Sequence, residues 1–218
     1  MKKSLLKPLT FCFVILICVI SLARLSMPNV GAPSSKPKQQ EVKTTAVKKK
    51  TAASFRPYQD PADLRQPLDW HQSSEYKSYP KIKRLENDIT IRVSLKGNRV
   101  YILRDNRRIY TMLASGGLFK KGKSLTPTGS FKIQDSRGDS FYNPNLNEGA
   151  NNWTSWDPNN VYLFHSVPTK DDGQYNVKEA KKLGKTQGSH GCIRLSIADS
   201  HWLLKNIKVG TKVIIKDN

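Results

Sequence analysis

The apolar residues divide the chain into three unequal parts. A nearly continuous apolar run occupies residues 9–23, mostly polar sequence follows it, and alternation of apolar and polar positions begins at Asp88. Only the last pattern is typical of a packed fold, so it predicts one folded domain at the C-terminal end. We therefore expect three regions, which cover residues 1–27, 28–87 and 88–218.

The C-terminal region carries the two-residue period of half-buried strands. Ile89–Leu95 alternates apolar residues with polar ones, and the turn residues Lys96-Gly97-Asn98 follow directly. The first three apolar runs are separated only by turns, which indicates a meander of antiparallel strands. Further runs of strand length recur along the chain, and the complete set after the first is residues 100–103, 109–114, 130–134, 161–164 and 211–215.

A single helix start is visible near the C-terminus. Ser196 is followed three residues later by Asp199, a pattern that resembles a capping box. Ile197 and Leu203 then supply apolar positions, and we expect the helix to end near Asn206. Together these patterns predict a mostly β domain with one C-terminal helix.

Charge narrows the choice of partner. The chain holds 37 Lys and Arg against 17 Asp and Glu, which gives a formal net charge of +20. A surface of this sign attracts nucleic acid, anionic lipid or an anionic polymer. Only three cysteines are present, and two of them lie in the apolar run, so a disulfide framework is excluded.

The N-terminus indicates the compartment. Lys2, Lys3 and Lys7 precede the apolar run, which is the order of an export signal. Residues 8–23 then act either as a cleaved signal peptide or as a membrane anchor, and both readings place the rest of the chain on the extracytoplasmic face. This location counts against nucleic acid as the partner. Anionic wall polymer or lipid headgroups fit it, or the charge only keeps the domain soluble.

The polar stretch before Asp88 has two compositions. Residues 28–57 are rich in Pro, Lys, Gln, Thr, Ser and Ala, which is typical of a disordered tether. Residues 58–87 add tyrosine, leucine and tryptophan to a polar background. This second segment either docks on the domain or continues the linker.

Cys192 is the one thiol outside the apolar run. A lone thiol in an exported protein is either a buried apolar residue or a nucleophile. The flanking glycines allow a close approach of backbone to substrate, and the amides of Gly191 and Cys192 are candidates for stabilising an oxyanion. These neighbours favour the nucleophile. The complete run is Gly188-Ser189-His190-Gly191-Cys192-Ile193-Arg194-Leu195.

A cysteine nucleophile needs a neighbouring base, and three histidines are candidates. His165 follows an apolar strand, and His190 would share a face with Cys192 in an extended segment. His201 lies on the predicted helix and is more simply a surface residue. Cys192, His165 and His190 could alternatively ligate a metal, but no acidic residue or fourth ligand clusters near them.

The run from Ser189 to Leu195, with His165-Ser166 upstream, resembles the YkuD-type L,D-transpeptidase catalytic domain. Thr126-Pro127-Thr128-Gly129 is similar to the TPTG turn of that family. The resemblance covers residues 88–216 and implies a compact domain of β-sandwich or barrel-like form. Two further similar stretches are Ala114–Gly117, a strand end of small residues, and Gly210–Ile215, a closing strand.

The resemblance also implies roles for individual residues. Cys192 is the nucleophile, His165 is its base, and the backbone carbonyl of Ser166 orients the imidazole. No metal and no organic cofactor are implied. The positions that would shape the oxyanion site and the substrate pocket are Ser189, His190, Gly191 and Arg194.

The implied reaction is a two-step acyl transfer on the tetrapeptide stems of peptidoglycan. A thioester forms on Cys192 with release of D-Ala, and an amine of another stem then takes the acyl group to give a 3→3 cross-link. Water as the acceptor would make the chain an L,D-carboxypeptidase. An unreactive Cys192 would leave a non-catalytic wall-binding module.

Two features of the sequence leave alternatives open. Residues 169–185 form a polar, Lys-rich insert relative to the family, and we expect it to enlarge the loop over the active site. Four aromatic residues lie in a loop-like stretch, where they either form a wall for the substrate or pack the loop down. They are Phe141, Tyr142, Trp153 and Trp156.

Overall fold

The computed structural model describes residues 51–67, 69–83 and 88–218. The apolar run and the tether up to residue 50 lie outside these ranges, so the export signal stays a prediction. Within the described residues, no helix is both long and apolar enough to cross a bilayer.

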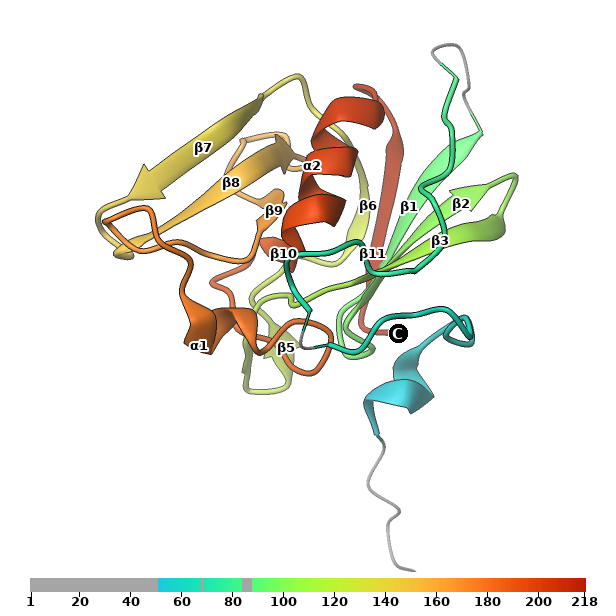
Figure 1. Cartoon of the computed structure of the whole chain (residues 1–218), viewed down its shortest axis with the longest axis horizontal. Coiled ribbons are helices and arrows are strands. Elements are labelled where there is room, and N and C mark those ends of the chain that lie inside the picture. Colours follow the sequence, from blue (N-terminus) through green and yellow to red (C-terminus); the bar gives the residue numbers. More distant parts are fainter. Residues whose placement is uncertain (1–50, 68, 84–87) are drawn as a thin grey trace, which may run out of the picture. The chain divides into compact units, whose positions relative to one another are not determined.

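Five strands form the largest sheet, and their order across it is β3 (Arg107–Leu113), β2 (Arg99–Arg104), β1 (Ile89–Ser94), β11 (Lys212–Lys216) and β6 (Gly129–Lys132) (Figure 1). The first three in sequence form the predicted antiparallel meander. Between β2 and β3, Asp105 and Asn106 both have positive φ, 48° and 61°. Asp and Asn tolerate this conformation, which suits a tight hairpin. β11 pairs parallel to β1 and antiparallel to β6, so the C-terminal strand lies between these two strands in the sheet.

Four strands form a second sheet, in the order β10 (Ile193–Leu195), β9 (Leu163–Ser166), β8 (Glu148–Ser155) and β7 (Arg137–Asn143). β7 and β8 are an antiparallel hairpin, whereas β9 and β10 run parallel. Parallel neighbours need a crossover connection, and this one contains the short helix α1 (Val177–Ala180). A separate small hairpin pairs β4 (Phe119–Lys120) with β5 (Lys123–Ser124).

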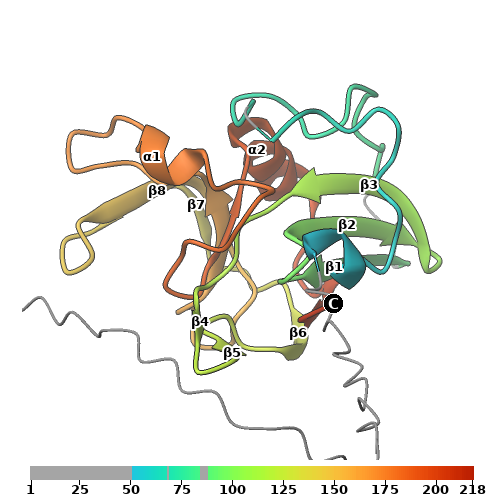
Figure 2. The ribbon, with the colours of Figure 1, turned by 90° about the horizontal axis from the view of Figure 1, so that it is seen from below.

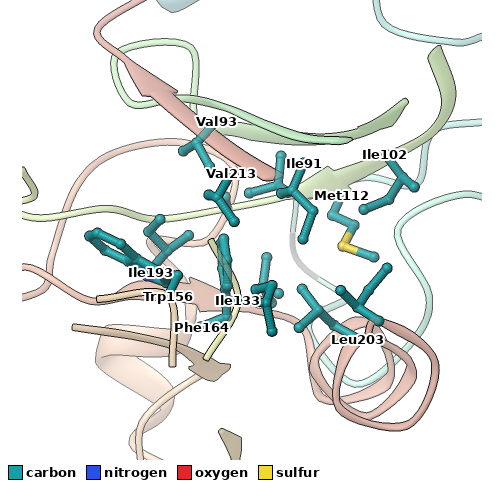
Figure 3. Close-up of a cluster of buried hydrophobic side chains, with 14 of the residues drawn as sticks. Ile91, Val93, Ile102, Met112, Ile133, Trp156, Phe164, Ile193, Leu203 and Val213 are labelled. Carbon is teal, nitrogen blue, oxygen red and sulfur yellow. The ribbon is translucent and has the colours of Figure 1, made fainter. Parts of the chain in front are cut away.

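The main core lies where both large sheets meet helix α2 (Ile197–Asn206) (Figure 3). Ile91 and Val213 come from the five-stranded sheet, Phe164 and Ile193 from the four-stranded sheet, and Leu203 from the helix. Each is at most 1% exposed. Full burial of a side chain of this size contributes about 1.5–3 kcal/mol to stability. The core therefore holds β9 and β10 firmly by their inner faces.

Helix α2 begins as predicted. The Oγ of Ser196 accepts a hydrogen bond from the N–H of Asp199 at 3.0 Å. The Asp199 carboxylate also accepts from the Ser74 N–H at 3.2 Å, from the Ser74 hydroxyl, and from the Tyr79 hydroxyl at 2.8 Å. The first turn of the helix thus binds a segment from the polar part of the chain.

Residues 51–67 and 69–83 form a strap that packs against the β domain (Figure 2). Asp60 binds the Arg99 guanidinium through hydrogen bonds of 3.0 and 2.8 Å. The Tyr79 ring stacks on Trp202 of α2, with centroids 5.2 Å apart. Trp70 is 8% exposed and completes a second small core, whose other buried members are Leu113, Val167, Ala180 and Leu183.

The tether predicted for residues 28–57 does not extend through residues 51–57, because Arg56 donates to the Gly97 carbonyl at 3.0 Å and the Phe55 carbonyl accepts from the Ser94 hydroxyl at 2.8 Å. Docking was the alternative for residues 58–87, and the strap packs on the domain in that way. Single aromatic and charged side chains of the strap hold it on the domain, and each contacts a different part of the domain. These residues have no regular spacing, so the sequence pattern did not predict the docking. The fold class is confirmed as mostly β with one C-terminal helix, to which the structure adds the four-residue α1.

Candidate active site

The parallel pair of β9 and β10 positions the candidate catalytic residues. Its register sets Ile193 opposite Phe164, and Arg194 opposite His165. Ile193 and Phe164 belong to the core, so by alternation His165 and Arg194 lie on the other face of the sheet. Cys192 immediately precedes β10, and the same alternation gives it the face of Arg194. The thiol and the imidazole thus come from neighbouring strands on one face.

His165 is held in a single tautomer. Its side chain is 2% exposed, and Nδ1 lies 2.6 Å from the carbonyl oxygen of Ser166. A carbonyl only accepts, so Nδ1 carries the proton and Nε2 keeps its lone pair. Burial and, to a smaller extent, the positive charge of Arg194 together lower the pKa of His165 to about 3, against the hydrogen bond to Ser166, which raises it. The imidazole is therefore neutral at pH 7 and can accept a proton at Nε2.

Cys192 is a partly exposed thiol. Its Sγ lies 4.0 Å from the carbonyl oxygen of Val161. Burial of the sulfur raises the pKa of Cys192 to about 11, although the Leu163 N–H and the charge of Arg194 act in the opposite direction. The resting pair is therefore a neutral thiol beside a neutral imidazole. The thiol must lose its proton as it attacks, and the lone pair of His165 can take it.

Hydrogen bonds fix the loop that presents Cys192. The Ser189 hydroxyl donates to the Cys192 carbonyl at 2.5 Å and accepts from the Gly191 N–H at 3.1 Å. From the TPTG turn, the Thr126 hydroxyl donates to the Gly191 carbonyl at 2.7 Å and accepts from the Gly117 N–H at 2.8 Å. Two buried hydroxyls therefore lock the nucleophile loop.

Gly191 allows close packing at this point of the loop. Its φ is 144°, and a Cβ there would lie 2.3 Å from the ring of Tyr162. Its N–H is bound to Ser189, so of the two amides considered for an oxyanion site the Gly191 amide is occupied. The Cys192 N–H has no hydrogen-bond acceptor among the described residues. Of the two candidate amides, the Cys192 N–H is therefore the one that can donate to an oxyanion without first losing another hydrogen bond.

The two remaining expected site residues, His190 and Arg194, differ in their exposure. His190 is exposed, and Arg194 is only 1% exposed. The Arg194 guanidinium binds Glu148 Oε2 at 2.6 Å and Glu179 Oε2 at 2.7 Å, so it is a buried, paired charge. His201 is exposed on α2, where the sequence suggested a surface residue.

The four aromatic residues of the loop-like stretch divide into two groups. The Phe141 ring meets the His165 ring edge to face, with centroids 5.7 Å apart, and Trp153 lies 6.4 Å beyond Phe141. Trp156 is fully buried in the core, and Tyr142 is exposed and bonded to Asn147. Only Phe141 and Trp153 therefore border the candidate site.

The insert differs from expectation, and the metal alternative finds no support among the described residues. Residues 169–185 do not simply extend a surface loop, because Ala180 and Leu183 are buried against Trp70 of the strap. Within the described part of the chain, no group of three or more His, Cys, Asp and Glu residues could hold a metal ion. The three-ligand site of Cys192, His165 and His190 is thus not formed.

Three residues at the site were missed from the sequence. Glu148 and Glu179 lie 46 and 15 positions from Arg194, and nothing local marks either as its partner. Tyr162 packs across Gly191 and stacks on Trp156, with centroids 5.7 Å apart. Its place directly before the strand of His165 was the only available signal.

Comparison with known proteins identifies the class to which this fold and site belong. The chain belongs to the YkuD family of L,D-transpeptidase catalytic domains, whose model matches residues 88–215. It is 41% identical over 148 residues to YciB of Bacillus subtilis (strain 168), a protein that carries an L,D-transpeptidase name. That alignment covers 68% of this chain and 74% of the relative.

Solved structures give more distant matches. One is a fused Zn-dependent amidase/peptidase/peptidoglycan-binding domain-containing protein of Clostridium acetobutylicum ATCC 824, with 26% identity and a TM-score of 0.44. Another is an L,D-transpeptidase from Mycobacterium smegmatis, with 20% identity and a TM-score of 0.47. Each alignment covers 59% of this chain, and it covers 52% of the first structure and 58% of the second. The chain thus spans less than two thirds of either structure.

Proposed function

We propose that this chain is a cysteine-dependent L,D-transpeptidase that acts on peptidoglycan tetrapeptide stems. The observation that carries the proposal is the fixed tautomer of His165, whose free Nε2 lies on the same sheet face as the Cys192 thiol. Membership of the YkuD family supports the same reaction class. Ser166 acts through its backbone carbonyl, which holds the imidazole in place.

In the first step, the Cys192 sulfur attacks the carbonyl carbon of the third stem residue while its proton passes to Nε2 of His165. The oxyanion forms next to the Cys192 N–H, which is the available backbone donor. The carbon–nitrogen bond to D-Ala then breaks, and the leaving amine takes the proton from His165. A thioester and free D-Ala result.

In the second step, an amine of another stem attacks the thioester carbonyl and gives its proton to Nε2. The carbon–sulfur bond breaks, the sulfur regains a proton from His165, and a 3→3 cross-link is formed. Phe141 and Trp153 form an apolar wall beside the imidazole, against which a stem could lie. If water attacks instead, the product is a tripeptide, and the chain is an L,D-carboxypeptidase.

The proposed place of action is the extracytoplasmic face of the envelope. Residues 8–23 would export the chain and either anchor it or be cleaved, as their sequence predicts. We also propose contact with an anionic wall polymer. A surface hollow of about 460 Å³ is lined by four cations, Lys83, Arg137, Lys205 and Lys208, and Lys205 also lies 3.7 Å from Asp139.

Intact-mass analysis tests the acyl transfer. The ectodomain, which is the chain without residues 1–27, is exposed to a carbapenem, and its Cys192→Ala variant serves as the control. A stoichiometric adduct that requires Cys192 is the expected result, because an activated thiol opens the lactam to a covalent acyl-enzyme. A folded protein that forms no adduct would contradict the proposal and favour the wall-binding module.

Product analysis then separates the two enzymatic alternatives. Purified tetrapeptide stems are incubated with the ectodomain, and the products are resolved by mass. A cross-linked dimer together with free D-Ala indicates transfer. Tripeptide alone indicates hydrolysis and would replace the transpeptidase by the carboxypeptidase.

A further inference from the structure

Arg194 is a cation buried directly beside the reacting pair. It lies in register with His165 on the neighbouring strand and shares a sheet face with Cys192 two residues before it. Its side chain is 1% exposed, so solvent hardly screens its charge. A buried guanidinium is tolerated only where carboxylates compensate it.

Two carboxylates from separate elements hold this guanidinium. Glu148, the first residue of β8, binds Nη2 at 2.6 Å, and Glu179 of α1 binds Nη1 at 2.7 Å. Because the two contacts use different nitrogens, they fix the plane of the fork as well as its place. Glu179 is also bound by Lys182 Nζ at 2.6 Å. The cluster therefore holds two positive and two negative groups.

The cluster bears on both members of the reacting pair. The charge of Arg194 lowers the pKa of His165 and that of Cys192, whereas Glu148 raises the pKa of Cys192. Asp157, a buried carboxylate that follows β8, also raises the pKa of the thiol. Glu148 thus opposes at the sulfur what Arg194 does there.

We propose that Glu148 and Glu179 are positioning residues, which hold Arg194 and balance its charge so that His165 can take the proton of Cys192. The inference rests on the proposed acyl transfer. When the sulfur attacks, an imidazolium forms at His165 next to the guanidinium, and two like charges then share a buried site. The carboxylates offset this repulsion. They touch neither the thiol nor the imidazole, so they act through Arg194, and Glu148 also acts through its own field at the sulfur.

A merely structural clamp is the alternative to this proposal. Glu148 connects the β7–β8 hairpin to β10, and Glu179 connects the insert to the same strand. A clamp of this kind would change the unfolding temperature when it is broken. It would leave the pH dependence of thiol reactivity unchanged.

The experiment measures the rate of Cys192 alkylation by iodoacetamide between pH 7 and 12 in the otherwise intact chain. Glu148→Gln and Glu179→Gln each remove one negative charge without removing the side chain. The field of Arg194 then acts on the sulfur with less opposition, so the midpoint shifts to lower pH by about one unit. Acylation by a carbapenem slows about tenfold, because the imidazolium forms less readily.

Matched variants separate charge from structure. Asp139→Asn makes the same charge change on the same hairpin. The Asp139 side chain is 89% exposed and its ion pair with Lys205 is long, at 3.7 Å. The alkylation midpoint of this variant should therefore equal that of the unmodified chain. Glu148→Asp keeps the charge and should restore part of the loss. Lys182→Met removes a cation that binds only Glu179 in this cluster, and it should move the midpoint to higher pH.

An unchanged alkylation midpoint in folded glutamine variants would overturn the proposal. If those variants fail to fold, a Lys182→Met midpoint that stays in place or moves down would overturn it as well. The assay reads thiol reactivity and needs no stem peptide. A chain that shows the shifts but yields no acyl transfer would therefore contradict the proposed function and leave the electrostatic role standing.

Discussion

The hydroxyl of Thr126 connects two loop segments, because it donates to the Gly191 carbonyl at 2.7 Å and accepts from the Gly117 N–H at 2.8 Å. Thr126 is 1% exposed, so water cannot take over either contact. The TPTG turn therefore contributes to the site by fixing the loop that carries Cys192.

Replacement of Thr126 by valine keeps the shape of the side chain and removes both hydrogen bonds. Each buried group left without a partner costs about 1–3 kcal/mol, so the free energy of unfolding should fall by about that amount or more. Acylation by a carbapenem should slow about tenfold, because the nucleophile loop loosens. Thr128→Val alters an exposed threonine of the same turn and should change neither quantity. Equal behaviour of the two variants in urea unfolding and in acylation would contradict this role.

A methyl group at Gly191 should disable the site. The residue has φ of 144°, and the added Cβ would lie 2.3 Å from the Tyr162 ring and 3.0 Å from the Leu125 carbonyl. Gly173→Ala is the matched control, since its φ is also positive, at 77°, but no atom lies within 4 Å. The control should lose about 1–2 kcal/mol from backbone strain alone. Gly191→Ala should lose more stability and most of its acylation, and a loss equal to that of the control would show that the clash is relieved without effect.

The reactivity of Cys192 should rise through the alkaline range without a plateau near neutrality. Burial raises the pKa of the thiol to about 11 and lowers that of His165 to about 3, so no thiolate–imidazolium pair exists at rest. The alkylation rate should therefore increase about tenfold per pH unit from pH 7 to 9. Stopped-flow alkylation with iodoacetamide measures this. A pH-independent rate between pH 6 and 8 that disappears in His165→Ala would reveal an ion pair and contradict the expectation.

The strap should be required for stability. Trp70 is 8% exposed and fills the second core, so Trp70→Ala should lower the free energy of unfolding by about 3–5 kcal/mol. Tyr76→Ala removes another aromatic ring from the strap, at a position that is 67% exposed, and should cost about 1 kcal/mol or less. Urea unfolding compares them. Similar small losses for both would mean that the strap contributes little to the fold.

Asp199 should make stability depend on pH. Burial raises its pKa to about 6 from a usual 3.8, so the folded state holds this proton more tightly than the unfolded chain does. The associated stability is fully present below about pH 4 and is lost as pH rises through 6. Between pH 4 and 7 the unmodified chain should therefore lose about 2.4 kcal/mol relative to Asp199→Asn. Urea unfolding at a series of pH values measures the difference, and parallel curves would contradict it.

The strongly alternating segments were predictable, and the polar ones were not. Ile89–Leu95 has one buried face with regular spacing, and its strand was found. The sequence of the β7–β8 hairpin predicts a loop, because Gly, Asn and Ser interrupt it and none of the β7 positions is buried. The helix start at Ser196 was found from capping chemistry alone.

The candidate site was predictable where its residues are adjacent in sequence. The run around Cys192 and the pair His165-Ser166 marked the thiol and the imidazole. The pairing of Arg194 with Glu148 spans 46 positions and depends on the order of the sheet, in which β9 lies between β10 and β8. Only tertiary structure brings such charges together. The same holds for the contact between Ser74 and Asp199, which spans 125 positions.

The crossover between β9 and β10 has a consequence for how this protein can change. The register of the two strands is held by their own ladder and by Phe164 and Ile193 beneath it, and not by the length of the connection. Residues 170–174 form an exposed turn within that connection, and space around Gly173 is open. Extra residues can therefore accumulate there while Cys192 and His165 keep their spacing. The turn is a tolerant site where related chains can diverge and where an engineered module could be grafted.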